Sequence, residues 1–158
     1  MSTKRRFLSW LIAGAAIGGS VLVGCTRLPA DWGDAARVEV FEQSSCIGDI
    51  AELEQGPGER MQAQGGEGRL RIDYLDAHFR CDQKVVGYFN MSAGRVDVLV
   101  QPADMHPASV PKCDCLYDIH LDLPLAAGTY EVTLYKRWDD RQSPNEPVRI
   151  GTVRVTVR

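Results

Sequence analysis

The feature that most constrains this chain is the alternation of apolar and polar residues between Cys113 and Leu123. Cysteine, aromatic and aliphatic side chains occupy the odd positions, and aspartate or histidine occupies the even ones, with Leu116 as the exception. Successive side chains of a β-strand point to opposite faces of a sheet, so a period of two predicts a half-buried strand. A helix with this sequence would carry aspartates around its whole circumference.

Short segments of the same kind recur along the chain and are separated by turns that contain glycine or proline. They predict seven strands, at residues 37–43, 70–81, 85–91, 96–100, 113–123, 129–136 and 150–157. Between the first two, we expect a helical turn or two at Ile47–Leu53 and a flexible surface loop at Gln55–Gly68, which is rich in glycine and glutamine. The pattern predicts an all-β protein with a single antiparallel β-sandwich.

The element Gly128-x-Tyr130 resembles the tyrosine corner of immunoglobulin-like and fibronectin-III-like domains, in which the phenol hydroxyl bonds to upstream backbone. A plain core tyrosine is the alternative. The run His78 to Cys81, followed by Cys113-x-Cys115-x-Tyr-Asp and the Gly-x-Tyr hairpin, looks like a pattern of small bacterial lipoproteins of unassigned function. These resemblances imply an immunoglobulin-like fold and a location, but no activity, because sandwiches carry unrelated functions.

The N-terminus has the three parts of an export signal: basic residues at 4–6, an apolar run over Phe7–Val23, and a small-residue exit. The exit Leu22-Val23-Gly24-Cys25 resembles the lipobox of bacterial lipoproteins, which implies cleavage before Cys25 and attachment of lipid to its sulfur. We therefore expect a signal peptide at 1–24, a lipidated tether at 25–36 and the sandwich at 37–158. The alternative is a transmembrane anchor, for which the 17 residues of the apolar run are at the short limit.

The lipobox resemblance also implies a cellular location. Two or three acyl chains hold a protein on a membrane, and Thr26, rather than aspartate, after the cysteine favours the outer membrane of a Gram-negative bacterium over its inner membrane. The periplasmic and surface faces both remain open. So do the general and the twin-arginine export routes, since Thr3–Leu8 only weakly matches the latter.

Four cysteines remain beyond Cys25: Cys46, Cys81, Cys113 and Cys115. An even number in an oxidising compartment predicts two disulfides. Positions i and i+2 of a strand lie about 6.6 Å apart with parallel Cβ directions, which disfavours a bond within the Cys113–Cys115 pair. One member of this pair should bond to Cys46 and the other to Cys81, with both assignments open.

The alternative to disulfides is a zinc or copper site on Cys113, Cys115 and His106, because thiolates and imidazoles are the ligands of such metals. The sequence lacks the paired C-x-x-C spacing of most zinc sites, and His120 falls on the strand face opposite the two cysteines. We therefore expect no cofactor.

No nucleophile motif or phosphate-binding loop is present, and Asp114, Asp118 and Asp122 are best interpreted as a solvated sheet face. The net charge is −3, and the chain beyond residue 24 holds 15 basic against 21 acidic residues, which argues against nucleic acid as a partner. The sequence predicts a non-enzymatic binding or structural module, with the membrane as one partner and a protein as a further candidate. Tyr135 and Trp138 are candidates for an exposed recognition patch or, alternatively, for an aromatic cap at a strand end.

Overall fold

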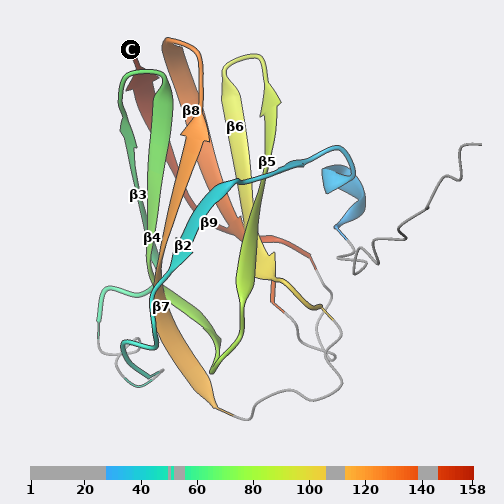
Figure 1. The fold of residues 1–158 in the computed structure, drawn as a ribbon, viewed down its shortest axis with the longest axis vertical. Coiled ribbons are helices and arrows are strands. Elements are labelled where there is room, and N and C mark those ends of the chain that lie inside the picture. The colour runs from blue at the N-terminus through green and yellow to red at the C-terminus, as the bar shows by residue number, and fades with distance from the viewer. Residues whose placement is uncertain (1–27, 50, 52–55, 106–112, 139–145) are drawn as a thin grey trace, which may run out of the picture.

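The computed structural model describes residues 28–49, 51, 56–105, 113–138 and 146–158, and these form an all-β fold of two sheets (Figure 1). One short 3-10 helix, η1 (Ala30–Trp32), precedes the strands. The strands of the described residues are β1 (Ala36–Arg37), β2 (Val40–Gln43), β3 (Arg60–Gly65), β4 (Arg69–Arg80), β5 (Val85–Ser92), β6 (Arg95–Pro102), β7 (Asp114–Pro124), β8 (Gly128–Lys136) and β9 (Val148–Val157).

The five-stranded sheet has the order β1-β5-β6-β8-β9, and the four-stranded sheet has the order β2-β7-β4-β3. The four-stranded sheet is antiparallel throughout, as the sequence predicts. The five-stranded sheet is mixed, because β6 and β8 run parallel to each other. This departure follows from the path of the chain: after β6 it crosses to β7 in the other sheet and then returns as β8, which restores the direction of β6.

The core lies between the two sheets. The inner face of the four-stranded sheet contributes Leu70, Ile72, Ile119 and Leu121, and residues of β6 and β8 cover them from the opposite side. Along β7 the odd positions from Cys115 to Leu123 are buried and the aspartates at the even positions are partly exposed, as the alternation predicts. Burial of apolar surface at roughly 25 cal/mol per Å² is the main term that holds the sheets together.

The described residues form nine strands rather than seven, partly because the segment predicted as one strand at 37–43 divides between the sheets. β1 pairs with β5, whereas β2 pairs with β7. Between them Val38 is buried and donates a backbone hydrogen bond to the Gly87 carbonyl over 2.9 Å. Gly87 permits this crossing, since a Cβ there would lie 2.8 Å from Cδ2 of Leu121.

The other additional strand, β3, occupies residues predicted as part of a flexible loop. Its partner β4 lies on one side, and β9 of the opposite sheet packs against it. A Cβ on Gly65 would lie 2.0 Å from the carbonyl oxygen of Thr156, so the two backbones approach more closely than any side chain would allow. The prediction failed because it equated low apolar content with a loop, whereas this strand uses glycine to reach its neighbour.

Two further local expectations change. Ile47 and Gly48, predicted to begin a helical turn, exchange backbone hydrogen bonds of 3.0 Å with Leu116 and so continue the edge beside β7. Ala51 of the same segment is helical, and residues 50, 52 and 53 lie outside the described residues. The turn after β7 is not a hairpin, because β7 and β8 belong to different sheets; residues 125–127 arch from one sheet to the other.

Candidate functional site

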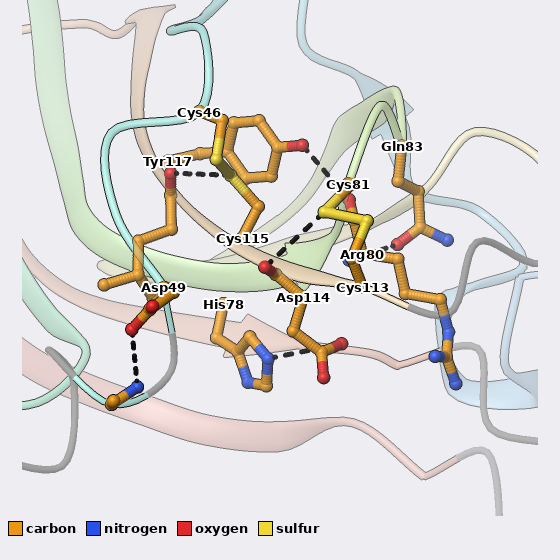
Figure 2. Close-up of polar contacts among 12 residues, drawn as sticks. Cys46, Asp49, His78, Arg80, Cys81, Gln83, Cys113, Asp114, Cys115 and Tyr117 are labelled. Atoms are coloured by element: carbon orange, nitrogen blue, oxygen red, sulfur yellow. Dashed lines mark hydrogen bonds and ion pairs between the residues drawn. A yellow bond between two sulfur atoms is a disulfide. The ribbon is translucent and has the colours of Figure 1, made fainter.

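The four cysteines beyond Cys25 meet at one end of the four-stranded sheet (Figure 2). Cys46 forms a disulfide with Cys115, and Cys81 forms one with Cys113, with Cα–Cα separations of 5.7 and 5.5 Å. Each of the two neighbouring cysteines therefore reaches a distant one, in agreement with the sequence argument. The structure also supplies the assignment that the sequence left open.

Both disulfides join neighbouring strands of the same sheet. Cys46 follows β2 and Cys81 follows β4, and these strands flank β7 on its two sides. The bonds thus fasten three adjacent strands near the start of β7, whereas the disulfide of antibody domains connects one sheet to the other. In this oxidised form Cys113 and Cys115 offer no thiolate to a metal. His106, the third residue of the metal alternative, lies outside the described residues, and the described residues hold no cluster of three or more metal-binding side chains.

A buried polar cluster lies between the sheets near the disulfides; we call it the Glu59 network. Oε1 of Glu59 accepts hydrogen bonds from the Tyr74 hydroxyl at 2.5 Å, the His78 backbone N–H at 2.8 Å and Nζ of Lys136 at 2.8 Å. Tyr74 and His78 belong to β4 of one sheet, and Lys136 belongs to β8 of the other. The network therefore bridges the two layers through a single carboxylate oxygen.

The electrostatics of the Glu59 network follow from its burial. Burial raises the pKa of Tyr74 well above its usual value, and the adjacent carboxylate raises it further. Burial lowers the pKa of Lys136, although its ion pair with Glu59 opposes this effect. The pKa of His78 is also lowered, first by burial and then by the positive charge of Lys136. These directions keep Tyr74 and His78 neutral at pH 7, next to one buried ion pair.

Aromatic rings enclose the ammonium group of Lys136. Its Nζ lies 4.6 Å from the ring centre of Trp138 and 5.1 Å from that of Phe79, within the range of cation–π attraction. Trp138 in turn stacks on Phe79 with an interplanar angle of 16°. Trp138 thus packs as an aromatic cap at the end of β8 and not as an exposed recognition residue.

The outer face of the four-stranded sheet carries a charged row formed by residues at matching register positions. His120 of β7 lies between Glu42 of β2 and Asp73 of β4. Nδ1 of His120 lies 2.6 Å from Oδ1 of Asp73, which also accepts a hydrogen bond of 3.1 Å from Arg71. Partial burial by itself would raise the pKa of Asp73, but the hydrogen bonds from His120 and Arg71 outweigh it and lower the pKa.

This row has the histidine–carboxylate geometry that orients a general base, but the described residues that line the hollow beside it include no serine, cysteine or threonine. The hollow measures about 100 Å³ and is lined by Val40, Glu42, Arg71, His120 and Asp122. The aspartates at 118 and 122 are partly exposed on this face, as predicted. The arrangement is that of a solvated, charged surface.

Two larger grooves flank the crossing between β1 and β2. One, of about 430 Å³, lies beside Val40, Phe89 and Leu123, with Arg37 and Arg69 among its lining residues. The other, of about 700 Å³, lies beside Val38, Phe41 and Val86. Both fall within the size range of small-molecule sites, and they share the walls formed by Ala36, Arg37 and Glu39.

The segment predicted as a tether is packed onto the domain from Leu28 onward. Trp32 in η1 is 7% exposed and belongs to a second apolar cluster with Val86, Tyr88 and Leu99 on the outer face of the five-stranded sheet. Tyr135 meets the Trp32 ring edge-on, with ring centres 5.7 Å apart. The folded part therefore begins before residue 37, and Tyr135, like Trp138, is part of a packed aromatic group.

Tyr130 of β8 donates a hydrogen bond of 3.0 Å from its hydroxyl to the carbonyl oxygen of Ala126. This bond spans the arch from β7 to β8, four residues upstream. The link from hydroxyl to upstream backbone, expected from the resemblance to a tyrosine corner, is present.

Cys25 and the rest of residues 1–27 lie outside the described residues. Within the described part of the chain, no helix has the length and apolar character needed to cross a membrane. Comparison with known proteins gave no matching family model, no matching curated protein and no matching solved structure.

Sequence reasoning missed the Glu59 network, although one signal was available. Lys136 lies an even number of positions from Val132 and Leu134, so the alternation of the strand puts its side chain on the core side of β8. A buried ammonium needs a negatively charged partner. Glu59 carries no comparable signal, because it lies just before a strand that the sequence did not predict.

Proposed function

We propose that the protein is a lipoprotein held on a membrane outside the cytoplasm, where its β-domain acts as a non-enzymatic binding or structural module. The observation that carries this proposal is the position of the lipobox cysteine relative to the folded domain. Leu28, the first residue that the structure describes, packs on the domain three positions after Cys25, so a lipid on the sulfur of Cys25 would join the domain directly to the bilayer. Thr26 after the cysteine favours the outer membrane of a Gram-negative bacterium.

The cysteine pairs support this location. Disulfides persist in oxidising compartments and are rare in the cytosol, and both pairs lie at bonding separations. A domain secured by two disulfides suits the periplasm or the cell surface. The charged row on the outer face of the four-stranded sheet and the grooves beside β1 and β2 are the candidate contact sites for a protein partner or a ligand.

We further infer that the domain is a variant of the immunoglobulin-like β-sandwich. Two packed sheets and the hydroxyl bond of Tyr130 across the β7–β8 arch support this assignment. Two features distinguish the variant: the parallel pairing of β6 with β8, and disulfides that lie within one sheet.

The test replaces Cys25 by alanine and follows the protein by membrane fractionation and mass spectrometry. The parent should fractionate with membranes and give an N-terminal peptide that begins at Cys25 and carries diacylglycerol. Cys25→Ala should accumulate as the uncleaved precursor. Recovery of Cys25→Ala in the membrane fraction without precursor, or of a parent peptide without lipid, would refute the proposal.

A further inference from the structure

The segment from Leu28 to Arg37 is packed against the domain. Leu28 packs with the apolar cluster around Trp32, and the Trp32 N–H donates a hydrogen bond of 2.9 Å to the Pro29 carbonyl. The side chain of Asn90 donates one of 3.3 Å to the Asp31 carbonyl. β1 then joins the edge of β5. From Leu28 to Arg37, contacts with the outer face or the edge of the five-stranded sheet thus hold the chain.

The length of chain before this segment limits how far the domain can stand from its anchor. Cys25 and Leu28 are three residues apart. Even a fully extended chain covers at most about 11 Å over this interval. This maximum distance is no more than about the separation of two packed sheets, which is about 10 Å. The surface that carries Leu28 therefore stays within about one sheet separation of the anchor.

From these two observations, we propose that the outer face of the five-stranded sheet around Trp32 lies against the phospholipid bilayer that holds the lipid of Cys25. The proposal rests on the lipid anchor proposed above. It implies that the opposite surface, with Glu42, Asp73 and His120, points away from the membrane into the aqueous compartment. A partner would therefore meet the charged row first.

The experiment measures energy transfer from single tryptophans to a dansyl group on the phospholipid headgroups. The lipidated mature protein is reconstituted into phosphatidylethanolamine–phosphatidylglycerol vesicles. Cleavage before Cys25 removes Trp10, which leaves Trp32 and Trp138 as the tryptophans of the mature chain. Trp138→Phe isolates Trp32. Trp32→Phe combined with Trp138→Phe and Gln62→Trp places the donor on the exposed outer face of β3.

Trp32 should transfer energy strongly, and the donor at position 62 should transfer several-fold less. A twelve-residue Gly-Ser spacer between Thr26 and Arg27 should abolish most of the transfer from Trp32, since such a spacer adds roughly 20 Å of root-mean-square reach. Circular dichroism of each variant checks that the fold is retained. A Gln62→Trp variant that fails this check is replaced by Gln64→Trp, which lies on the same exposed face.

Two different failures can be distinguished. If the protein floats with the vesicles but the two donors transfer equally, or the spacer changes nothing, the orientation is wrong while the anchor stands. If the protein does not float with the vesicles and its N-terminal peptide lacks lipid, the anchor itself is wrong, and the orientation falls with it.

Discussion

Nζ of Lys136 lies 2.8 Å from Oε1 of Glu59, so a lysine from the five-stranded sheet is neutralised by a carboxylate that lies just before β3 of the four-stranded sheet. The side chains of the pair are only 10% and 20% exposed. Removing one partner of a buried ion pair leaves the other charge without compensation, whereas replacing both with neutral groups costs much less.

Glu59→Gln should therefore destabilise the protein by about 3–5 kcal/mol, measured by urea unfolding. The double variant Glu59→Gln with Lys136→Met should recover a large part of this loss, because it removes the buried ammonium as well. Additive losses in the double variant would show that the two residues do not act as a pair.

The two disulfides should make comparable contributions to stability. They close loops with sequence separations of 69 and 32 residues, and the chain-entropy model gives about 4 kcal/mol for each. Replacing Cys46 and Cys115 together by serine, or Cys81 and Cys113 together, should lower the unfolding free energy by this order.

Peptide mapping of the unreduced protein provides the independent check on these cysteines. It should yield one peptide pair linked through Cys46 and Cys115 and another linked through Cys81 and Cys113. Detection of four free thiols, or of a bond between Cys113 and Cys115, would contradict the arrangement.

Stability should fall as the pH drops below about 6.5, because the pKa of His78 is lowered from 6.5 in the folded state. The unfolded chain takes up the proton first, so protonation favours unfolding until the pH has passed the folded pKa. Above pH 6.5 both states hold His78 neutral, and the full stability is retained. His78→Gln should reduce the loss of unfolding free energy between pH 7 and pH 5, measured by chemical denaturation. An unchanged profile would show that other groups cause this loss.

Asp73 should add a second loss of the same sign at lower pH. Its pKa is lowered from 3.8, so its contribution is present above that pH and disappears as the pH falls through the folded value. Asp73→Asn should flatten the stability profile below pH 4. A change confined to pH 6 would contradict the assignment.

Gly65→Ala should disrupt the junction between β3 and β9, because the new methyl group would lie 2.0 Å from a backbone carbonyl oxygen of Thr156. Overpacking of this kind costs typically 1–3 kcal/mol, and more where backbone must move. The adjacent Gly66→Ala is the matched control, since its nearest neighbour is Cγ of Arg69 at 3.4 Å. Equal thermal stability of the two variants would show that the close approach is not needed.

The sequence predicted the parts of the fold in which one strand carries its own signal. The alternation along β7 gave its inner and outer faces, and Tyr130 was placed correctly beside its turn. The spacing of Cys113 and Cys115 disfavoured a bond between them, and each is bonded to a distant cysteine instead.

The sequence did not predict how distant strands pair and pack with one another. The parallel pairing of β6 with β8 depends on how often the chain crosses between the sheets, which no local pattern encodes. β3 was missed because its glycine serves contact with β9 and not a turn. Likewise, the side chain that neutralises Lys136 comes from a residue 77 positions away.

The bond between Cys46 and Cys115 has a mechanical consequence. A pull on the N-terminus would first strip η1 from the sheet surface and then separate β1 and β2 from their neighbours, since all three precede Cys46. At Cys46 the force would pass through sulfur into β7, which is itself tied to Cys81 through Cys113. Residues 47–114 would then lie off the line of tension, so they could add nothing to the extension of the chain while this bond holds.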